Sequence, residues 1–539
     1  MVAAQARSVT LPRVQELKES FDRQSAEGPL VILSRRLMSD QLTPVLAYRR
    51  LVLPDERTAP SFLFESVENG ANVGRHSILG ARPVLELSSK GFATTIVDHR
   101  RRTRRSIGEA EGGRDPLAVL RELAAPYRPA SREALASLKL PAAFTGGFVG
   151  FASFDSVRYL EPEKLSFERA PKDDRAIPDL HFGLYQDIVV FDHVAKTLHA
   201  IVSARIDEFP TRERAFASLV DRLDALEAQL AADGPRLAHG AIDIDLARRP
   251  EVPPSNITRA DFEGLVRRAQ EYIRAGDAFQ VVLSQRLERK TSVDPFDLYR
   301  ALRVVNPSPY QIYLQGEGAI LVASSPEILC RVHDGVVTNR PLAGTRPRGR
   351  TAEDDARLEA ELLADDKERA EHVMLVDLGR NDIGRVCETG SIAIERCMEV
   401  ERYSHVMHIS STVTGRLRAD CDAFDALRAT LPVGTVSGAP KVRAIEIIDE
   451  LEPTRRGPYS GGIGAIGYSG NMDIALALRT MVIPVPDGAR APWTVHLQAG
   501  AGVVLDSDPA AEWQETINKA SALGRAIDLA EHAFAAAKR

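Results

Sequence analysis

A pair of glutamates in residues 365–385 is the first candidate for chemistry in this sequence. Glu368 and Glu371 lie three positions apart, which makes them neighbours on one face of a helix. Apolar residues recur beside them at helical spacing, so the segment is predicted to be a helix with an apolar face. That face would carry Ala370, Val373, Met374 and Leu378. The two carboxylates would border it, where they could line a cleft.

A second glutamate pair lies in residues 507–520, where Asp508 suits a helix N-cap and Glu512, Glu515 and Lys519 share a helical face. If the two helices face each other, four carboxylates converge, and unit charges about 4 Å apart repel by roughly 4 kcal/mol at an effective dielectric near 20. Mg²⁺ would relieve this repulsion, because it takes oxygen ligands, typically one or two carboxylates with water and an anionic substrate. Alternatively, both pairs are solvated helix faces.

Composition restricts the classes of function. The chain has 539 residues, 27% charged and 44% apolar, which is typical of a soluble globular protein. Its net charge is −6 and its basic residues are dispersed, so no nucleic-acid partner is expected. No apolar run is long enough to predict a membrane span. The four cysteines are widely spaced, which predicts neither a zinc site nor a disulfide framework and favours a cytoplasmic protein with reduced thiols.

Two features near the C-terminus could bind an anion. Residues 474–485 and 493–499 are predicted to form a hairpin, and Arg479 in its first strand shares a face with small and apolar residues. A buried arginine without a partner is costly, which favours an anionic ligand. The glycine-rich stretch 498–502 could offer backbone amides to the same anion. Earlier in the chain, Gln280 interrupts an apolar strand and needs a polar partner, in the structure or in a substrate.

The chain is predicted to divide at residues 233–257, where helical periodicity is lost and Gly, Pro and Arg accumulate. Residues 11–232 and 258–530 would then be two regions joined by a linker. Glycine-rich strands occur in both regions, at 146–155 and 459–473. They could mark an internal repeat, although glycine-rich strands also resemble one another by chance.

Several short motifs occur in order along the chain. They are FLFES at 62–66, NPSPY at 306–310, PLAGTRPRG at 341–349, AEHVMLVDLGRND at 370–382, GTVSGAPK at 434–441, GGIGAIGY at 461–468 and QAGAGVVLDSDP at 498–509. By their joint order and spacing, the chain resembles component I of anthranilate synthase, within the chorismate-utilising enzymes, over nearly all of residues 61–527. The resemblance implies an α+β fold, a large layered αββα sandwich.

The resemblance also implies chorismate as substrate and Mg²⁺ as metal, with Glu371 and Glu515 as the metal ligands. It implies Glu327 as the general acid for a departing hydroxyl, which requires a raised pKa in a shielded pocket. His408 would act in the elimination of pyruvate, and Thr345 would be a third catalytic position. The positions that match the family's chorismate contacts are Gly344, Thr345, Tyr459, Arg479, Gly500, Ala501, Gly502 and Lys519.

The implied reaction adds ammonia at C2 of chorismate, expels the C4 hydroxyl and eliminates pyruvate, which gives anthranilate for tryptophan biosynthesis. Gln280 stands where isochorismate- and salicylate-forming relatives carry a lysine that activates water. Ala343 stands where many aminodeoxychorismate synthases carry a lysine. Both residues favour attack of ammonia at C2. The alternatives are component I of aminodeoxychorismate synthase, in the folate pathway, and a non-catalytic regulatory relative.

Partners are also implied by the resemblance. No segment resembles a glutaminase, so ammonia would come from a separate glutamine amidotransferase subunit, component II, in a heterotetramer. Tryptophan would act as a feedback inhibitor, bound by regulatory elements of residues 11–232 together with the NPSPY segment. The positions expected to bind it are Ser66, Pro309, Tyr310 and Gln311.

Overall fold

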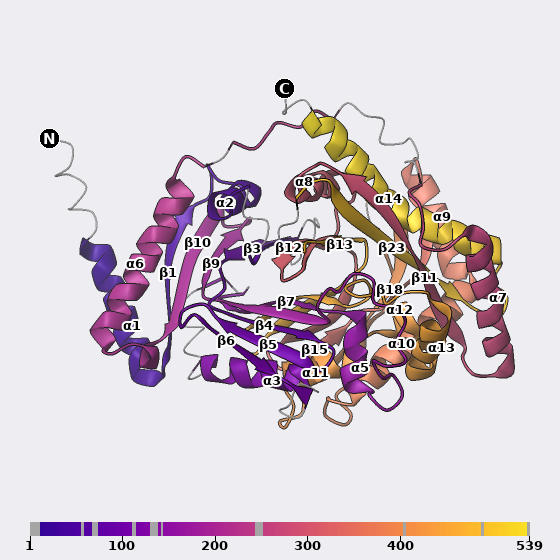
Figure 1. Ribbon diagram of the computed structural model, residues 1–539, viewed down its shortest axis with the longest axis horizontal. Helices are drawn as coiled ribbons and strands as arrows, with labels where there is room; N and C mark the ends of the chain where they lie inside the picture. Colours follow the sequence, from indigo (N-terminus) through magenta and orange to yellow (C-terminus); the bar gives the residue numbers. More distant parts are fainter. Residues whose placement is uncertain are drawn as a thin grey trace.

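Two large antiparallel sheets lie face to face in the centre of the protein, with helices outside them (Figure 1). The computed structural model describes residues 11–54, 59–66, 74–109, 115–129, 138, 140–141, 144–234, 236–242, 252–402, 406–486 and 490–535. Among these residues, no helix combines the length and the apolar character needed to cross a membrane.

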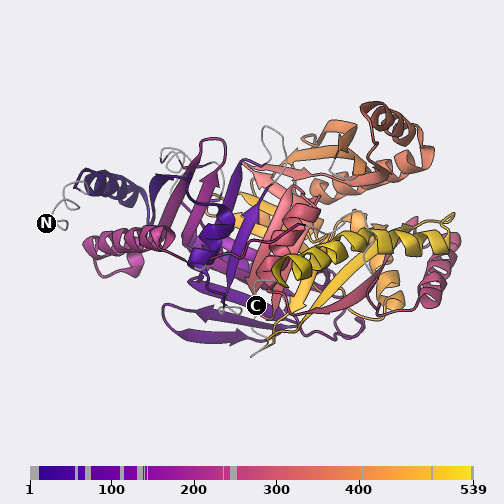
Figure 2. The ribbon, with the colours of Figure 1, turned by 90° about the horizontal axis from the view of Figure 1, so that it is seen from above.

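The first sheet has eleven strands. In spatial order they are β1 (Leu30–Met38), β10 (Thr197–Arg205), β9 (Asp187–Asp192), β3 (His76–Ala81), β2 (Ser61–Glu65), β12 (Tyr310–Gly316), β13 (Ala319–Ser325), β22 (Thr480–Pro484), β23 (Trp493–Val503), β11 (Gln280–Thr291) and β19 (Gly438–Ala439). Its outer face is covered by α1 (Leu11–Glu27), α2 (Pro44–Leu51), α6 (Arg212–Ala231), α8 (Pro295–Val305) and α14 (Pro509–Ala535) (Figure 1 and Figure 2).

The second sheet has twelve strands. In order they are β16 (Leu342–Pro347), β18 (Val406–Arg416), β15 (Val336–Asn339), β14 (Ile328–His333), β21 (Met472–Leu476), β20 (Gly462–Gly467), β7 (Gly147–Ala152), β8 (Leu180–Tyr185), β4 (Leu85–Lys90), β5 (Ala93–Asp98) and β6 (Thr103–Ile107), with β17 (Ala393–Arg402) paired to β18. The helices α3 (Pro116–Ala124), α9 (Ala352–Ala364), α10 (Asp366–Gly384) and α11 (Ala423–Thr430) belong to this side, and α7 (Arg259–Ala275), α12 (Gly434–Ser437) and α13 (Lys441–Leu451) pack around β11.

Alternation along the strands builds two cores. Phe62 of β2 points between the sheets, where it joins Phe148 of β7, whereas its neighbour Leu63 points outward to Tyr48 and Phe296 of the helices. One apolar layer therefore lies between the sheets and another lies under the helices, which is the layered αββα arrangement. The predicted α+β sandwich is confirmed.

The order of elements repeats between the two halves of the chain. In the first sheet, β1, β2, β3, β9 and β10 have the same relative places as β11, β12, β13, β22 and β23. In the second sheet, β4, β5, β7 and β8 correspond to β14, β15, β20 and β21. The halves meet where β2 pairs with β12 and β7 pairs with β20. The glycine-rich stretches that suggested a repeat form β7 and β20, so the repeat is present in the topology.

This arrangement shows how the two predicted regions meet. Strands from residues 11–232 and from residues 258–530 occur in both sheets, so the regions do not form separate sheets. Part of the predicted linker, at residues 235 and 243–251, lies outside the described residues. The assignment of regulation to the first region and catalysis to the second stays a prediction.

The predicted hairpin of residues 474–485 with 493–499 is wrong in its first strand. That segment contains two strands, β21 in the second sheet and β22 in the first, and residues 477–479 cross between the sheets. Of these two strands, only β22 pairs with β23. Both strands are buried and apolar, so the hydrophobic pattern continues through the crossover and does not mark the change of sheet.

Candidate active site

Two crossovers between the sheets lie side by side, and each presents a predicted site residue. The step from β13 to β14 contains Glu327, and the step from β21 to β22 contains Arg479. The Leu476 amide donates to the Glu327 carbonyl at 3.0 Å, and the Ser324 amide donates to the Arg479 carbonyl at 3.1 Å. Arg479 has a left-handed backbone with φ 48°, as expected for a sharp turn between strands. The paired crossovers thus hold the backbone segments of Glu327 and Arg479 against each other.

Glu327 has the environment of a carboxylic acid rather than a carboxylate. Its side chain is buried, with 5% of the residue surface exposed. Burial raises its pKa to about 8, although the Thr435 hydroxyl and the charge of Lys519 act in the opposite direction. Thr435 donates a hydrogen bond to Oε1 of Glu327 at 2.9 Å. Glu327 is therefore protonated at neutral pH and held in one orientation.

Two cationic side chains, Arg479 and Lys519, belong to the same site as this acid. Nη1 of Arg479 donates to the Lys519 carbonyl at 2.7 Å. The Lys519 ammonium donates to the Gly500 carbonyl at 3.0 Å and pairs with Glu515 at 2.6 Å. Burial lowers the pKa of Arg479, while Tyr459 and Glu515 act against that shift. Two cations near one strand end make the site suited to an anionic ligand.

Glycines on β23 allow polar groups to approach its backbone. A Cβ at Gly500 would lie 3.2 Å from the hydroxyl of Tyr459 and 2.9 Å from the Leu283 carbonyl. A Cβ at Gly502 would lie 2.6 Å from Nε2 of Gln280 and 3.5 Å from Glu371. Gly500 and Gly502 therefore leave the strand without side-chain bulk between Tyr459 and Glu371, and the binding of an anion by this backbone stays a prediction.

The helix that carries Glu371 buries a different face from the predicted one. Its buried residues are His372, Leu375, Val376, Gly379, Asp382 and Ile383, whereas Ala370 and Val373 are exposed. Aspartate and histidine occupy part of the buried face, so apolar spacing alone indicates the wrong stripe. The Asp365 side chain caps the helix, because its Oδ1 accepts hydrogen bonds from the backbone amides of Lys367 and Glu368.

The two glutamate pairs approach the same strand from two helices. Nε2 of Gln280 donates to Oε1 of Glu371 at 2.8 Å, which places Glu371 at Gly502, and Lys519 links Glu515 to Gly500. Burial raises the pKa of Glu368 and of Glu512, and the neighbouring Glu371 and Glu515 carboxylates add to the two shifts respectively. Such repulsion is what a bound cation would relieve.

The expected convergence of four carboxylates is not seen. Within the described ranges, no three Asp, Glu, His or Cys side chains gather in a group that could hold a metal. Glu371 and Glu515 supply one carboxylate each, and two carboxylates completed by water and an anionic substrate are a usual Mg²⁺ environment. The donor chemistry fits Mg²⁺.

His408 lies on β18 opposite Thr345 of β16. Its Nδ1 donates to the Gly344 carbonyl at 2.8 Å and lies 3.0 Å from the Thr345 hydroxyl. Burial lowers the pKa of His408 to about 4, and the charges of Arg479 and Lys519 contribute. The ring is therefore neutral, with its proton on Nδ1 and its lone pair on Nε2, which can accept a proton.

The residues expected to bind an inhibitor are also brought together. In the β2–β12 pair, Glu65 lies opposite Gln311, so Ser66 is adjacent to the segment that contains Pro309 and Tyr310. The Ser66 hydroxyl is buried and has no hydrogen-bond partner among the described residues. The amide of Gln311 donates to the Asn306 carbonyl at 2.8 Å and to the Ser324 hydroxyl at 2.9 Å. Since Ser324 bonds the Arg479 backbone, this region touches the candidate active site.

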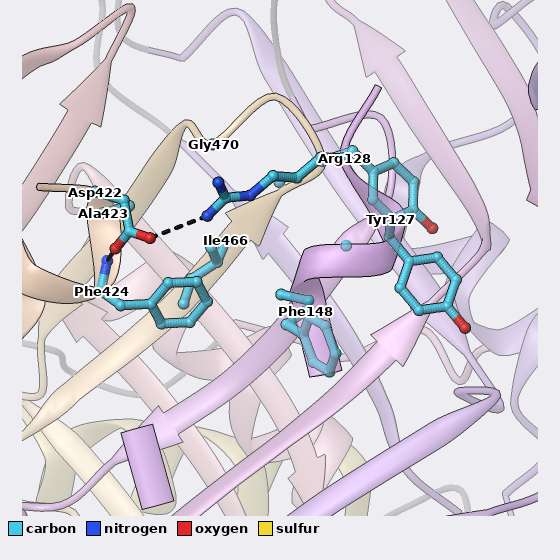
Figure 3. A pocket seen from close by; sticks show the side chains of 12 residues that line it. Tyr127, Arg128, Phe148, Asp422, Ala423, Phe424, Ile466 and Gly470 are labelled. Atoms are coloured by element: carbon cyan, nitrogen blue, oxygen red, sulfur yellow. Dashed lines mark hydrogen bonds and ion pairs between the residues drawn. The ribbon is translucent and has the colours of Figure 1, made fainter. Parts of the chain in front are cut away.

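One pocket lies away from all these residues. Tyr127, Phe148 and Phe424 line it, and Arg128 donates to Asp422 at 3.0 Å across it (Figure 3). It contains no predicted site residue, and we assign it no role.

Sequence reasoning missed Thr435. The GTVSGAPK segment is one of the ordered motifs, but it is a poor match to a nucleotide-binding loop and none of its residues is predicted to belong to the site. Its contact with Glu327 joins residues 108 positions apart, so only its place among the ordered motifs could have indicated it.

The site defines a class of enzyme: a buried acid and a neutral histidine both lie within reach of the charge of Lys519, with Arg479 and carboxylates suited to Mg²⁺ nearby, a combination suited to a small anionic substrate. The family model for chorismate binding enzymes matches residues 83–525. The chain therefore belongs to the chorismate binding enzyme family.

Named relatives narrow this assignment. Anthranilate synthase alpha subunit 1, chloroplastic, of Oryza sativa subsp. indica is 52% identical over 538 residues, which cover 97% of this chain and 92% of the rice protein. Anthranilate synthase component 1 of Pseudomonas aeruginosa is 44% identical over 523 residues, covering 95% of this chain and 99% of that protein. The crystal structure of anthranilate synthase component I from Streptococcus pneumoniae TIGR4 has a TM-score of 0.69 at 37% identity, covering 91% of this chain and 99% of that one. The resemblance found in the sequence is confirmed.

The expected cytoplasmic location is contradicted by these comparisons. The rice relative, and one of Arabidopsis thaliana at 52% identity, are named chloroplastic. Reduced cysteines fit a plastid as well as a cytosol, so cysteine usage does not distinguish the two compartments.

Proposed function

We propose that this chain is the chorismate-converting subunit of an anthranilate synthase, a lyase that forms anthranilate and pyruvate from chorismate and ammonia in tryptophan biosynthesis. The observation that carries this proposal is the pairing of the two crossovers that present Glu327 and Arg479, with Glu327 buried and its pKa raised to about 8. The names of the relatives agree with it.

Chorismate is a dianion, so binding requires positive charge at two places. Arg479, Lys519 and the backbone at residues 500–502 would hold one carboxylate, with Tyr459 against the ring. Glu371 and Glu515 would hold Mg²⁺, which supplies an electrostatic anchor for the ring carboxylate and offsets charge. Gly344 and Thr345 would border the ring from β16.

Protons move at two residues. Ammonia attacks C2 as the ring double bonds shift, and the C4 hydroxyl leaves as water after it takes the proton of Glu327. The Nε2 lone pair of neutral His408 then accepts the ring proton at C2, the C3–O bond breaks, and the enolpyruvyl group leaves as pyruvate after its methylene carbon gains a proton, which makes the ring aromatic. The hydrogen bond from Nδ1 to Gly344 keeps the imidazole in this tautomer.

The nucleophile is ammonia because the site offers no base to activate water where a lysine would stand. Gln280 fills that position, and its amide is bonded to Glu371. A glutamine amidotransferase subunit would deliver ammonia within a heterotetramer. The second candidate, aminodeoxychorismate synthase, would place the amine at C4, and the small Ala343 argues for C2.

The proposal is tested with the purified chain, chorismate, Mg²⁺ and ammonium. We expect a fluorescent product with the mass of anthranilate and one equivalent of pyruvate. Release of aminodeoxychorismate, which yields no pyruvate without a second lyase, would assign the chain to the alternative reaction. A chain that binds chorismate but turns over none would be a regulatory relative.

Tryptophan inhibition is proposed at Ser66. Replacing Ser66 with phenylalanine should put a bulky ring at the end of the β2–β12 pair, where we expect tryptophan to bind. The tryptophan concentration for half inhibition should rise by at least about tenfold, which corresponds to a loss of about 1.4 kcal/mol of binding free energy. This concentration is measured by following anthranilate formation at increasing tryptophan concentrations. Ser61, which is buried at the start of β2, gives a control as Ser61→Ala, which should keep normal inhibition. Unchanged inhibition in Ser66→Phe contradicts the assignment.

A further inference from the structure

Arg456 is one of the largest fully buried side chains of the described residues, and its guanidinium is surrounded by acceptors. Nε and Nη2 donate to the two oxygens of Glu452 at 2.9 and 2.6 Å. Nη1 donates to the Val436 carbonyl at 2.7 Å, and Nη2 also donates to the Val282 carbonyl at 2.7 Å. One planar group therefore joins the end of α13, the short helix α12 and strand β11.

Each of these contacts is one residue or one hydrogen bond away from the candidate active site. Val436 follows Thr435, whose hydroxyl holds Glu327. Glu452 accepts from the Ser284 amide at 2.7 Å and from its hydroxyl at 2.9 Å, and Ser284 lies opposite Gly500 in the β11–β23 pair. The ion pair is thus connected both to Thr435, which holds Glu327, and to the part of β11 that lies opposite Gly500.

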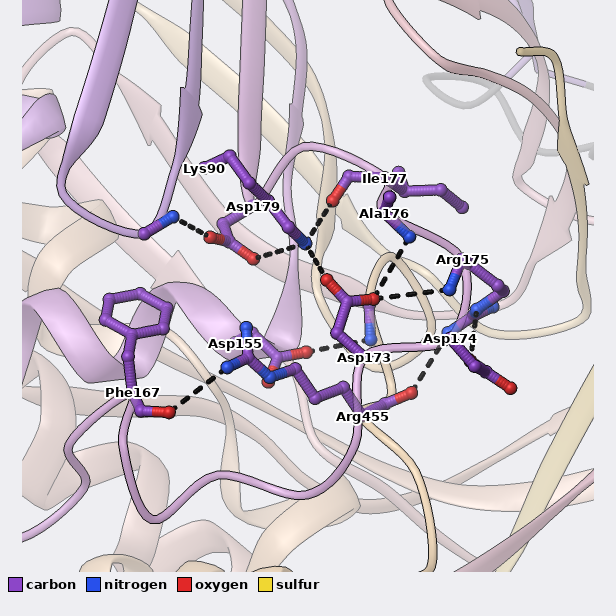
Figure 4. Close-up of polar contacts among 12 residues, drawn as sticks. Lys90, Asp155, Phe167, Asp173, Asp174, Arg175, Ala176, Ile177, Asp179 and Arg455 are labelled. Atoms are coloured by element: carbon purple, nitrogen blue, oxygen red, sulfur yellow. Dashed lines mark hydrogen bonds and ion pairs between the residues drawn. The ribbon is translucent and has the colours of Figure 1, made fainter.

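The same guanidinium also lies against two aromatic rings. Arg456 stacks over Phe154 at 4.6 Å and lies 6.0 Å from the ring centre of Tyr459, whose hydroxyl faces Gly500. A polar network braces this part of the backbone, where Arg175 donates to the Arg455 and Arg456 carbonyls at 3.0 and 2.8 Å (Figure 4). Arg456 therefore has little freedom to move.

A buried ion pair is weak evidence for stability, since apolar residues of similar size can often replace both partners without loss. The planar guanidinium can instead fix the relative positions of the segments that it joins, because its several donors belong to one rigid group. We propose that Arg456 and Glu452 form a positioning pair for the reaction: they set the place of Thr435 against Glu327 and of Tyr459 against Gly500. This inference rests on the proposed function and names residues that do not touch the substrate.

The test is Arg456→Lys in the full chain, which keeps the charge and removes the fork. A matched control is Arg49→Lys, because Arg49 is equally buried, pairs with Asp294 at 3.0 Å and stacks on Phe296 at 4.4 Å, far from the site in sequence and in the other half of the topology. Both variants should be folded by circular dichroism with lowered Tm. We expect Arg456→Lys alone to lower kcat by about 10 to 100-fold, with a smaller change in KM.

The pH profile separates positioning from stability. The Thr435 hydrogen bond holds the pKa of Glu327 down, so displacing Thr435 should move the alkaline limit of kcat to higher pH in Arg456→Lys and leave it in place in Arg49→Lys. A lowered Tm with unchanged kcat and pH limit would overturn the inference, as would an equal effect in the control.

Glu452→Gln serves if Arg456→Lys does not fold, because it keeps the shape of the pair and removes one charge. It should lower kcat and shift the same pH limit; a wild-type profile overturns the inference. Failure of the proposed function would be visible separately, as absence of anthranilate with the wild-type chain.

Discussion

Replacing Glu327 with glutamine is expected to lower kcat by about 10² to 10⁴-fold, the usual contribution of a positioned acid. Glutamine has nearly the same shape and can accept the Thr435 hydrogen bond, but it cannot give a proton to the departing hydroxyl. Steady-state anthranilate formation with ammonium measures the loss. KM for chorismate should change little, because the acid acts in the transition state.

The pH dependence gives this prediction its sharpest form. Glu327 must be protonated to act and burial raises its pKa to about 8, so kcat should fall as pH rises through about 8. Free ammonia is held constant at each pH so that its own titration does not mimic the limit. The residual activity of Glu327→Gln should lack this limit.

A buried carboxylate outside the site provides the control. Glu86 is buried on β4 and bonds His181 at 2.9 Å. Glu86→Gln should lose stability but keep kcat near that of the wild type. If Glu327→Gln retains full activity while Glu86→Gln does too, the leaving group is protonated by another donor and the assignment of the acid is wrong.

Removal of Mg²⁺ is expected to abolish anthranilate formation, and Glu371→Gln should weaken the response to Mg²⁺. The variant keeps a partner for Gln280 but removes one of the two anionic ligands. We expect the Mg²⁺ concentration for half-maximal activity to rise by about 10 to 100-fold, which corresponds to about 1.4 to 2.8 kcal/mol. Activity in EDTA followed by titration with Mg²⁺ measures both effects.

A measurement independent of turnover completes this test. A cation that binds the folded state raises Tm, so Mg²⁺ should stabilise the wild-type chain and have less effect on Glu371→Gln. Asp377→Asn is the control, because Asp377 is an exposed carboxylate on the same helix and pairs with Arg380, three residues further along that helix. Equal Mg²⁺ responses in all three proteins would show that Glu371 is not a ligand.

Local signals were sufficient for many elements. Thr258 caps α7 by accepting a hydrogen bond from the amide of Asp261, and Gly276 ends that helix with φ 87°, and threonine and glycine are residue types typical of these two positions. Asp508 likewise caps the start of α14 through the Ala511 amide. Such features depend on residues within one or two turns of each other, which is why the sequence reveals them.

Signals that depend on burial were less reliable. The helix α10 buries His372 and Asp382, which a hydrophobic pattern does not count, and it exposes Val373. The change of sheet between β21 and β22 leaves no mark, because strands in either sheet are equally apolar. In both cases the deciding neighbours come from distant parts of the chain.

The sequence by itself determined the fold class, the family and the types of groups that the site would contain, because ordered motifs and helical spacing are properties of the chain. Only the tertiary structure decided that Glu327 and Arg479 lie on adjacent crossovers and that Thr435 donates a hydrogen bond to the acid. It also decided that Arg456 joins the end of α13, α12 and β11. These relations join residues many positions apart through two sheets, and the sheet order that creates them is set by packing of the whole core.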